Sequence, residues 1–422
     1  MLVNFFGGGG NLSHVKPAGD SQYISFKWTM KIMAGKLMRV HKACLAGFAL
    51  VAILICFAIE PRSAVESDGL TSAEFARIVR DFSEEGGYFP SDNFTSSEDS
   101  YLTIVDKLKE LCPAGGAYIG VGPEQNFTYI ARIRPRIAFI VDIRRQAIIQ
   151  HLMYKAIFQL SPTRAQFLSR LLSRPMTAEK APAADAPMDE ILDFFAKIPA
   201  DAKTHEENLA SIRRAIQEES GFTLSTEDQA SLEYVYRSFR TWGFDVGFDA
   251  GRRRGRGFRG SPNLWELLSQ RDLKGKQGNF LASTVDYDFV RLMQSRNLII
   301  PVVGDFAGKK ALAAIAAYLV KHKMTVSVFY VSNVEIVLLD WGSFEQFADF
   351  VNNVKKLPAN DRTLLLRSTF SYYGHPSRLP GYQFCSFLQT LSSYLQDFSR
   401  GRYRTYQDLM KARFIAPDRP RQ

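Results

Sequence analysis

The sequence predicts an α/β protein built on a doubly wound, mostly parallel sheet. Short apolar runs such as AYIG, IAFIVDI and NLIIPVV alternate with longer stretches that have helical periodicity. These runs are apolar at successive positions, as strands are when helices cover both faces of a parallel sheet. The composition of the 422 residues, 46% apolar and 23% charged, is typical of a globular protein. We therefore expect one large sheet with helices on both faces.

The front of the chain predicts an anchor or export signal that precedes the folded domain. Residues 1–42 contain a glycine run and scattered basic side chains, and we expect them to be disordered. Residues 43–59 are apolar and uncharged, and as a helix they would measure roughly 26 Å, at the short end for a bilayer span. A transmembrane helix and a signal peptide are both compatible with this pattern.

The charges that flank residues 43–59 predict an orientation. Basic side chains precede the apolar run and mostly acidic ones follow it. This asymmetry predicts a cytoplasmic N-terminus and an extracytoplasmic domain, anchored in the inner membrane or exported in soluble form. The basic residues are Lys31, Lys36, Arg39 and Lys42, and the residues that follow are Glu60, Arg62, Glu66 and Asp68.

The remaining chain divides into a helical segment and a Rossmann-like sheet domain. Residues 65–114 predict two amphipathic helices, and Thr71 with Glu74 forms a capping box at the start of the first. Residues 115–422 contain the strands, with a helical insertion at about 161–250. The stretch FCSFLQTLSSYLQDF, residues 384–398, predicts a further helix near the C-terminus.

Basic charge is a weak guide to the partners of this chain. The net charge of +10 would suit a nucleic acid, an anionic lipid or an acidic substrate. A basic surface with one basic loop, and no specific partner, would give the same charge. The segment GRRRGRGFRG, residues 251–260, is similar to arginine-glycine segments that bind nucleic acid. So short a segment is more often an exposed loop. We do not expect a nucleic-acid partner.

The stretch YIGVGPEQNFTYI, residues 118–130, predicts a strand, a glycine turn and the start of a helix. Gly120 and Gly122 permit a tight turn, the place where many α/β proteins bind nucleotides. Pro123 removes one N–H from the helix start, and Glu124 adds negative charge there. A pyrophosphate needs free N–H groups and positive potential, so this turn disfavours NAD and FAD. Its acidity favours a cationic ligand.

Other strands also end in residues that suit an adenosine. Asp142 ends the second strand about 20 residues after Gly122, the offset expected for a group that binds the ribose hydroxyls. Asp305 ends a later strand and could accept a hydrogen bond from the adenine amino group. Each carboxylate could instead cap a turn at the surface. Arg144 and Arg145 could hold the extra phosphate of NADP, or point to solvent.

The order of these features resembles the core of class I S-adenosylmethionine-dependent methyltransferases, over roughly residues 115–165 and 285–370. The stretches GGAYIGVGPEQNFTYIARIRPRIAFIVDIRR, VVGDFAG and FYVSNVE also resemble an uncharacterised bacterial family with that core. The resemblance implies S-adenosylmethionine as the cofactor. Such methyltransferases carry an acidic residue before the first glycine, where this chain has Tyr118 and Ile119. The implied cofactor-binding residues are Gly120, Gly122, Glu124, Asp142 and Asp305.

The resemblance also implies a catalytic strand end at FYVSNVE, residues 329–335. Asn333 would accept a hydrogen bond from a substrate amine or hydroxyl, and Glu335 would take a proton. The alternative is that Asn333 caps the next helix and Glu335 lies in its first turn. The histidines and cysteines lack the spacing of a metal site, so no metal is expected.

Three functions follow from these patterns. The first is an S-adenosylmethionine-dependent methyltransferase of unknown substrate. The second is a non-catalytic Rossmann-like binding protein at or beyond the membrane. The third is an NADP-binding oxidoreductase, which only Arg144 and Arg145 favour. Since S-adenosylmethionine is a cytoplasmic metabolite, an extracytoplasmic domain would favour the second function over the first.

Overall fold

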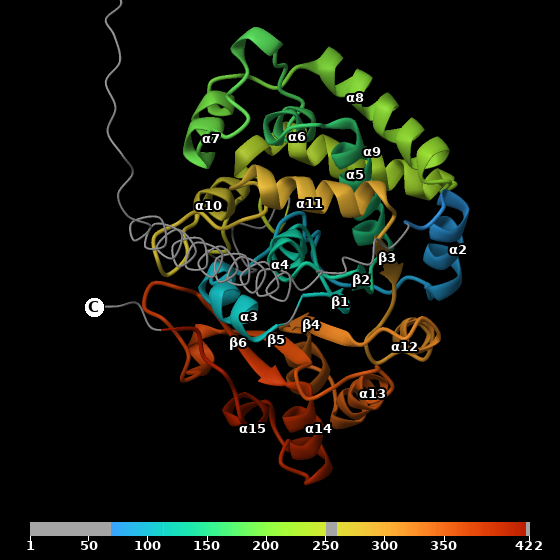
Figure 1. Cartoon of the computed structure of the whole chain (residues 1–422), viewed down its shortest axis with the longest axis vertical. Helices are drawn as coiled ribbons and strands as arrows, with labels where there is room; N and C mark the ends of the chain where they lie inside the picture. The colour runs from blue at the N-terminus through green and yellow to red at the C-terminus, as the bar shows by residue number, and fades with distance from the viewer. Residues whose placement is uncertain (1–68, 113, 250–259, 419–422) are drawn as a thin grey trace, which may run out of the picture. The chain divides into compact units, whose positions relative to one another are not determined.

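The computed structural model describes residues 69–112, 114–249 and 260–418 (Figure 1). The expectations for the first 68 residues, namely disorder, an apolar helix at 43–59 and its orientation, lie outside this part of the chain. Among the described residues, no helix is both long enough and apolar enough to cross a membrane. The described residues from 69 onward form one compact unit, which includes the helical segment that precedes the first strand.

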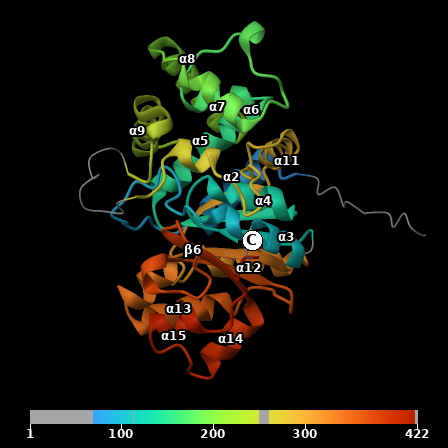
Figure 2. The ribbon, with the colours of Figure 1, turned by 90° about the vertical axis from the view of Figure 1, so that its left-hand side faces the viewer.

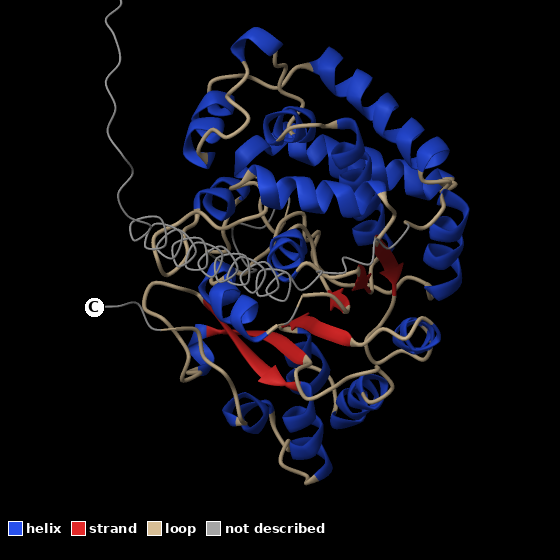
Figure 3. Ribbon diagram, in the orientation of Figure 1, coloured by secondary structure: helices blue, strands red, loops and turns tan. Residues whose placement is uncertain are grey.

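A six-stranded sheet lies between the helices of this unit (Figure 3). Its order is β3-β2-β1-β4-β5-β6, in which β1 to β5 are parallel and β6 is antiparallel to β5. One mostly parallel sheet is therefore confirmed. The strands are β1 (Ala117–Gly120), β2 (Ile137–Asp142), β3 (Ile299–Val303), β4 (Val326–Ser332), β5 (Leu364–Phe370) and β6 (Phe384–Thr390).

Helices cover both faces of the sheet (Figures 1 and 2). On one face lie α4, α5 and α11, with the helical insertion α6 to α9 packed beyond α5. On the other face lie α12, α13 and α14. The bounds are α4 (Gln125–Ile133), α5 (Arg145–Leu160), α6 (Arg164–Leu171), α7 (Met188–Ala196), α8 (Ala202–Arg214), α9 (Thr226–Trp242), α11 (Thr284–Ser295), α12 (Ala311–Lys321), α13 (Phe344–Val354) and α14 (Leu391–Ser399).

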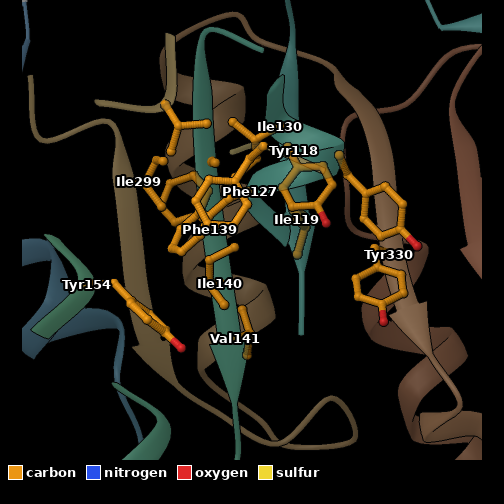
Figure 4. Packing of buried hydrophobic residues seen from close by; sticks show 14 of the residues in the cluster. Tyr118, Ile119, Phe127, Ile130, Phe139, Ile140, Val141, Tyr154, Ile299 and Tyr330 are labelled. Carbon is orange, nitrogen blue, oxygen red and sulfur yellow. The ribbon is translucent and has the colours of Figure 1, made fainter. Parts of the chain in front are cut away.

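The core of the unit is apolar because strands β1, β2 and β3 are buried on both faces. Every residue of β1, β2 and β3 is buried. Figure 4 shows Phe127 of α4 and Phe139 of β2 packed close together, with Tyr118 and Ile119 of β1 beside them. Helix α5 lies between the sheet and the insertion, so its residues from Ala147 to Phe158 are buried all round.

The helical segment before the sheet protects the open edge of β3. Helix α2 (Ser72–Phe82) packs against β3, and the expected capping box at Thr71 and Glu74 is present. Just after this helix, the hydroxyl of Ser83 accepts from the Val303 N–H at 3.0 Å. Pro301 fits here because β3 pairs only with β2, and a proline is tolerated at a sheet edge.

The prediction of one helix over residues 384–398 was wrong in its first half. Residues Phe384–Thr390 form β6, and the helix begins only at Leu391, where Thr390 caps it. Phe384, Phe387, Leu388 and Leu391 have the spacing of one helix face, so the local pattern favours a helix over a strand. Pairing with β5 decides between them, and it lies outside the local sequence.

The remaining helices connect the main elements. They are short. They are η1 (Tyr101–Ile104), α3 (Val105–Leu111), η2 (Ala178–Lys180), η3 (Ala215–Glu219), η4 (Gly243–Asp245), α10 (Leu264–Ser269), η5 (Ile336–Asp340), η6 (Ser371–Tyr373) and α15 (Tyr406–Lys411).

Candidate functional site

A cavity of about 260 Å³ lies at the carboxyl ends of strands β1 to β4. The turn after β1 contributes Gly122, and the end of β2 contributes Asp142. The residues after β3 and β4 contribute Asp305 and Asn333. The strand order reverses direction between β1 and β4, and such a switch point is where open α/β sheets bind ligands. Four of the expected site residues thus share one cavity.

Two further segments form part of the wall of this cavity. The loop between α2 and η1 contributes residues such as Tyr88, Ser96 and Glu98. The π-helical turn η5 contributes Val337 and Leu338, and Trp341 follows directly after it. Tyr88 is 84% exposed and Trp341 is 55% exposed, so two aromatic side chains stand at the opening. The cavity is therefore lined by apolar side chains with a few polar groups, as small-molecule sites are.

The glycine turn is held by buried side chains beneath it. The side-chain amide of Asn126 donates to the carbonyls of Val121 (2.9 Å) and Gly122 (3.0 Å). A Cβ at Gly120 would lie 2.0 Å from Asn126 Oδ1, so this glycine allows a close approach and does not line the cavity. Gly122 has a φ of +81°, which few other residues adopt without strain.

His151 of α5 also supports the glycine turn. Its Nε2 lies 2.9 Å from the Gly122 carbonyl, and since a carbonyl only accepts, the Nε2 atom carries the proton. Burial lowers the pKa of His151 to about 4, so the ring is neutral at pH 7. The turn is therefore fixed from below by two polar side chains, His151 and Asn126.

Glu124 lies under the turn and does not line the cavity. Its Oε1 accepts from the Ser96 N–H at 3.1 Å, which fixes the loop that precedes η1. Burial raises the pKa of Glu124 to about 7. A carboxyl group at the start of α4 leaves no positive potential there for a phosphate. The geometry thus places Glu124 in support of the loop and outside the cavity.

Asp142 reaches the cavity already paired with a cation. Arg144 donates to both of its carboxylate oxygens, with Nε to Oδ1 at 3.1 Å and Nη2 to Oδ2 at 2.9 Å. Both side chains are buried, so this pair is well shielded from solvent. Oδ1 also accepts from the Arg144 backbone N–H at 3.0 Å, so only Oδ2 keeps a lone pair with which Asp142 can accept from a ligand.

Arg144 and Arg145 are both occupied by carboxylates of the chain. Besides Asp142, Arg144 binds the carbonyls of Ser91 and Asp92. Arg145 forms a bidentate pair with Asp228 of α9, with N···O distances of 2.9 and 2.8 Å. Neither guanidinium group has the free fork of donors that a ribose phosphate would need. This geometry gives no support to an NADP site.

Asp305 lies beside Asp142 because β2 and β3 are paired neighbours. The N–H of Gly304 donates to the Asp142 carbonyl at 2.9 Å, and Asp305 is the next residue. Asp305 Oδ1 accepts from the Ala307 N–H at 2.9 Å, so it also caps its own turn. A Cβ at Gly304 would lie 2.3 Å from Ala311 Cβ, so this glycine lets α12 approach the strand end.

The two expected catalytic residues, which follow β4, lie in different surroundings: Asn333 faces the cavity and Glu335 does not. Asn333 lines the cavity, and its Oδ1 lies 3.2 Å from the Ser332 hydroxyl. Its side chain makes no cap bond to η5, although its carbonyl accepts from the Ile336 N–H. Ser332 has a φ of +53°, an uncommon backbone for serine, and such residues cluster at functional sites. Asn333 is thus placed to contact a ligand.

Glu335 is turned away from the cavity into the layer beneath β5. It is 2% exposed and does not line the cavity. Its Oε2 lies 2.7 Å from Nε of Arg367, and its Oε1 accepts from the Tyr394 hydroxyl at 2.8 Å. Arg367 is itself 1% exposed. The geometry therefore assigns Glu335 to a buried ion pair, where it has no access to a substrate in the cavity.

Glu98 is the carboxyl group of this cavity that the sequence patterns do not indicate. It lies in the loop before η1 and is 2% exposed, yet it lines the cavity. Its Oε1 accepts from the hydroxyls of Tyr330, at 2.9 Å, and Ser332. Gln125 Nε2 donates to its Oε2 at 3.1 Å. Burial raises the pKa of Glu98, while these hydrogen bonds lower it.

No local signal in the sequence distinguishes Glu98 from its neighbours. The loop also contains Glu84, Glu85 and Asp99, and its turn formers predict only an exposed connection. Glu84 caps α12 by accepting from the Ala311 N–H at 2.6 Å, and Asp99 accepts from the Phe384 N–H at 2.9 Å. Only the folded chain shows which carboxyl group faces the cavity.

A second, more open groove adjoins the cavity. It has a volume of about 820 Å³ and shares Tyr88, Phe89 and Arg144 with the cavity wall. Its far side is formed by α9, with Arg237 and Trp242. A ligand in the groove would therefore lie next to a ligand in the cavity, separated only by the residues that both share.

Two cysteines, Cys112 and Cys385, lie among the described residues. Both are buried, and no disulfide joins them. Burial raises the pKa of Cys112 to about 11 and that of Cys385 to about 12, so neither is a thiolate at neutral pH. Within the described part of the chain, no group of three or more His, Cys, Asp or Glu side chains is placed to hold a metal ion.

Comparison with protein families identifies the chain without giving it an activity. A family model described as a domain of unknown function, DUF7790, matches residues 94–419. The match covers most of the 422 residues, so the chain belongs to this family. No curated protein matches the chain.

Proposed function

We propose that this member of the DUF7790 family binds S-adenosylmethionine in the cavity at the strand ends and is a methyltransferase of unknown substrate. The observation that carries the proposal is the charge of the cavity. Its described lining contains the carboxyl groups of Glu98, Asp142 and Asp305, and the one basic side chain there, Arg144, is paired with Asp142. Such a lining favours a ligand with positive charge and disfavours a polyphosphate.

The strand order suggests how the ligand would lie. Asp305 and Asp142 follow β3 and β2, and they can accept from adenine and ribose. Gly122 lies between them and Asn333, so the transferred group would face the end of β4. The adjoining groove, which shares Tyr88 and Phe89, is the proposed place of the methyl acceptor.

Ligand binding to the full-length chain tests this proposal. S-adenosylhomocysteine, the product that the reaction would leave, should bind and raise the free energy of unfolding by about 2.7 kcal/mol at one hundred times its Kd. ATP and NADP should give no shift at the same concentration, because the helix starts at this site offer no phosphate-binding group. Calorimetry and thermal unfolding measure both effects. If ATP or NADP binds and S-adenosylhomocysteine does not, the proposal is wrong.

Asp305→Ala tests the position of the adenosine. This change should weaken S-adenosylhomocysteine binding by about 1.5–3 kcal/mol, the range for a hydrogen bond to a charged group. Asp361→Ala, at an exposed turn outside the cavity, is the control. Equal affinities of the two variants would place the adenosine elsewhere.

A non-catalytic binding protein on the same fold is the second candidate. It is favoured by the burial of Glu335, since the residue expected to take a proton is bound to Arg367 and has no access to the cavity. This second candidate includes an anchor at residues 43–59 that holds the folded domain outside the cytoplasm. A phosphatase reporter fused after Gln422 tests this topology. Reporter activity would favour the binding protein, and a cytoplasmic reporter would favour the methyltransferase.

A further inference from the structure

Glu98 differs from most buried carboxyl groups because it has only neutral partners. Its hydrogen bonds come from Tyr330, Ser332 and Gln125. No arginine, lysine or histidine among the described residues forms an ion pair with it; Arg144, the basic residue of the same lining, binds Asp142. Buried charges are ordinarily paired, and an unpaired one costs several kcal/mol. The folded chain therefore leaves this group without its expected counter-charge.

Glu98 lies at the side of the cavity that is farthest from the residues proposed to bind the adenine. Two of its partners, Tyr330 and Ser332, belong to β4, and Gln125 opens α4 directly after the glycine turn. Asp305 follows β3, and β2 and β1 separate that strand from β4. A ligand whose adenosine lies at Asp142 and Asp305 would thus extend past Gly122 toward Glu98.

We propose that Glu98 binds a primary ammonium group carried by the ligand at the β4 end of the cavity. The inference rests on the adenosine site proposed above and names the residue that selects the amino-bearing tail. The acidic residue expected before the first glycine is absent from β1, where Tyr118 and Ile119 stand. Glu98 supplies a carboxyl group to the same side of the sheet from a loop outside the β1 motif.

The protonation of Glu98 depends on its burial and on the titratable groups that face it. The titratable ones are the phenols of Tyr118 on β1, Tyr129 on α4 and Tyr330 on β4. Burial raises the pKa of each well above its ordinary value, so all three stay neutral. Burial likewise raises the pKa of Glu98, which favours its protonated form in the empty cavity. An entering ammonium group stabilises the carboxylate, and the Glu98 proton is released to solvent.

Two ligands and two variants of the full-length chain test the inference. S-adenosylhomocysteine carries the amino-bearing tail, whereas 5′-methylthioadenosine has the same adenosine and sulfur without it. Glu98→Gln keeps the size of the side chain and one oxygen that can accept from Tyr330 and Ser332, but it cannot become an anion. We expect it to weaken S-adenosylhomocysteine binding roughly 10- to 100-fold and to change 5′-methylthioadenosine binding less than about twofold. Calorimetry measures both affinities.

Glu124→Gln is the matched control, because Glu124 is also a buried carboxyl group with a raised pKa but does not line the cavity. It should leave both affinities unchanged. Thermal unfolding of each variant shows whether the fold is retained. Ser332→Ala removes one donor to Glu98 and should weaken the binding of S-adenosylhomocysteine but not that of 5′-methylthioadenosine.

The outcomes separate the inference from the function on which it rests. A selective loss of S-adenosylhomocysteine binding in Glu98→Gln supports the amine site. An equal loss of both ligands, or no loss, overturns it while the adenosine site stands. If the wild-type chain binds neither ligand, the proposed function fails and the amine site fails with it.

Discussion

Two buried glutamates close to β4 have opposite electrostatic surroundings. Glu98 and Glu335 are each 2% exposed. Glu335 is bound to Arg367 at 2.7 Å, whereas Glu98 accepts hydrogen bonds from neutral side chains and lines a cavity. A compensated carboxylate away from a cavity holds elements together, while an uncompensated one in a cavity is a candidate for function. The difference reverses the expectation that Glu335 takes part in chemistry.

The largest effect should come from breaking the Glu335 pair. Glu335→Gln removes the anion and leaves the Arg367 guanidinium buried without a counter-charge, which should lower the free energy of unfolding by about 3–5 kcal/mol. Glu98→Gln removes no ion pair and should cost far less at neutral pH. Urea unfolding of the two variants compares them. Equal destabilisation would show that the contrast between the two sites is not real.

The pH dependence of stability should sharpen the contrast. Because burial raises the pKa of Glu124 to about 7, the folded chain keeps a proton that the unfolded chain loses above about pH 4.5. Stability should therefore fall as pH rises from about 4.5 to 7, by up to about 3 kcal/mol. Glu124→Gln should remove this part of the loss. Glu98→Gln should act in the same direction, since burial also raises the pKa of Glu98.

Denaturant unfolding at pH 5 and at pH 8 measures this effect. The wild-type chain should lose more stability between the two conditions than either variant. A wild-type curve parallel to both variant curves would mean that Glu98 and Glu124 are ionised in the folded state.

A matched pair of tyrosines distinguishes the two acceptors. Tyr394 donates to Glu335 at 2.8 Å, and Tyr330 donates to Glu98 at 2.9 Å. Tyr394→Phe should cost about 1.5–3 kcal/mol, because Arg367 keeps its acceptor charged. Tyr330→Phe should cost less, about 0.5–1.5 kcal/mol, because the raised pKa of Glu98 favours the neutral form of its acceptor. Thermal unfolding ranks the two variants. The reverse order would assign the charge to Glu98.

The smallest effect is expected at a surface ion pair. Lys203 and Glu207 of α8 lie 3.8 Å apart, and their side chains are 84% and 67% exposed. Lys203→Ala should change the free energy of unfolding by about 0.5 kcal/mol or less, since solvent screens such pairs. This variant gives the baseline against which the loss in Glu335→Gln is judged. A cost above about 1 kcal/mol would show that exposure does not decide what an ion pair contributes here.

The sequence by itself determined most strands of the sheet and four residues at their carboxyl ends. Apolar runs bounded by turn residues identified β1 to β4, because strands buried on both faces carry a continuous local signal. Parallel strands expose their carboxyl ends at one edge, so Gly122, Asp142, Asp305 and Asn333 could be expected to meet, and all four line one cavity.

Only the tertiary structure decided which charged side chains near these strand ends are already paired with another charge of the chain. Arg144 and Asp142 are two residues apart in the sequence, but their pairing depends on how the strand end and the following loop fold. Glu335 lies two residues after Asn333, yet it turns toward Arg367 on β5, which a linear pattern cannot show. Glu98 reaches the cavity from a loop that precedes the first strand. Its partners Tyr330 and Ser332 are more than 200 residues away in the sequence, so no local pattern reveals these contacts. Charge compensation is a property of neighbours in space, and the sequence lists only neighbours along the chain.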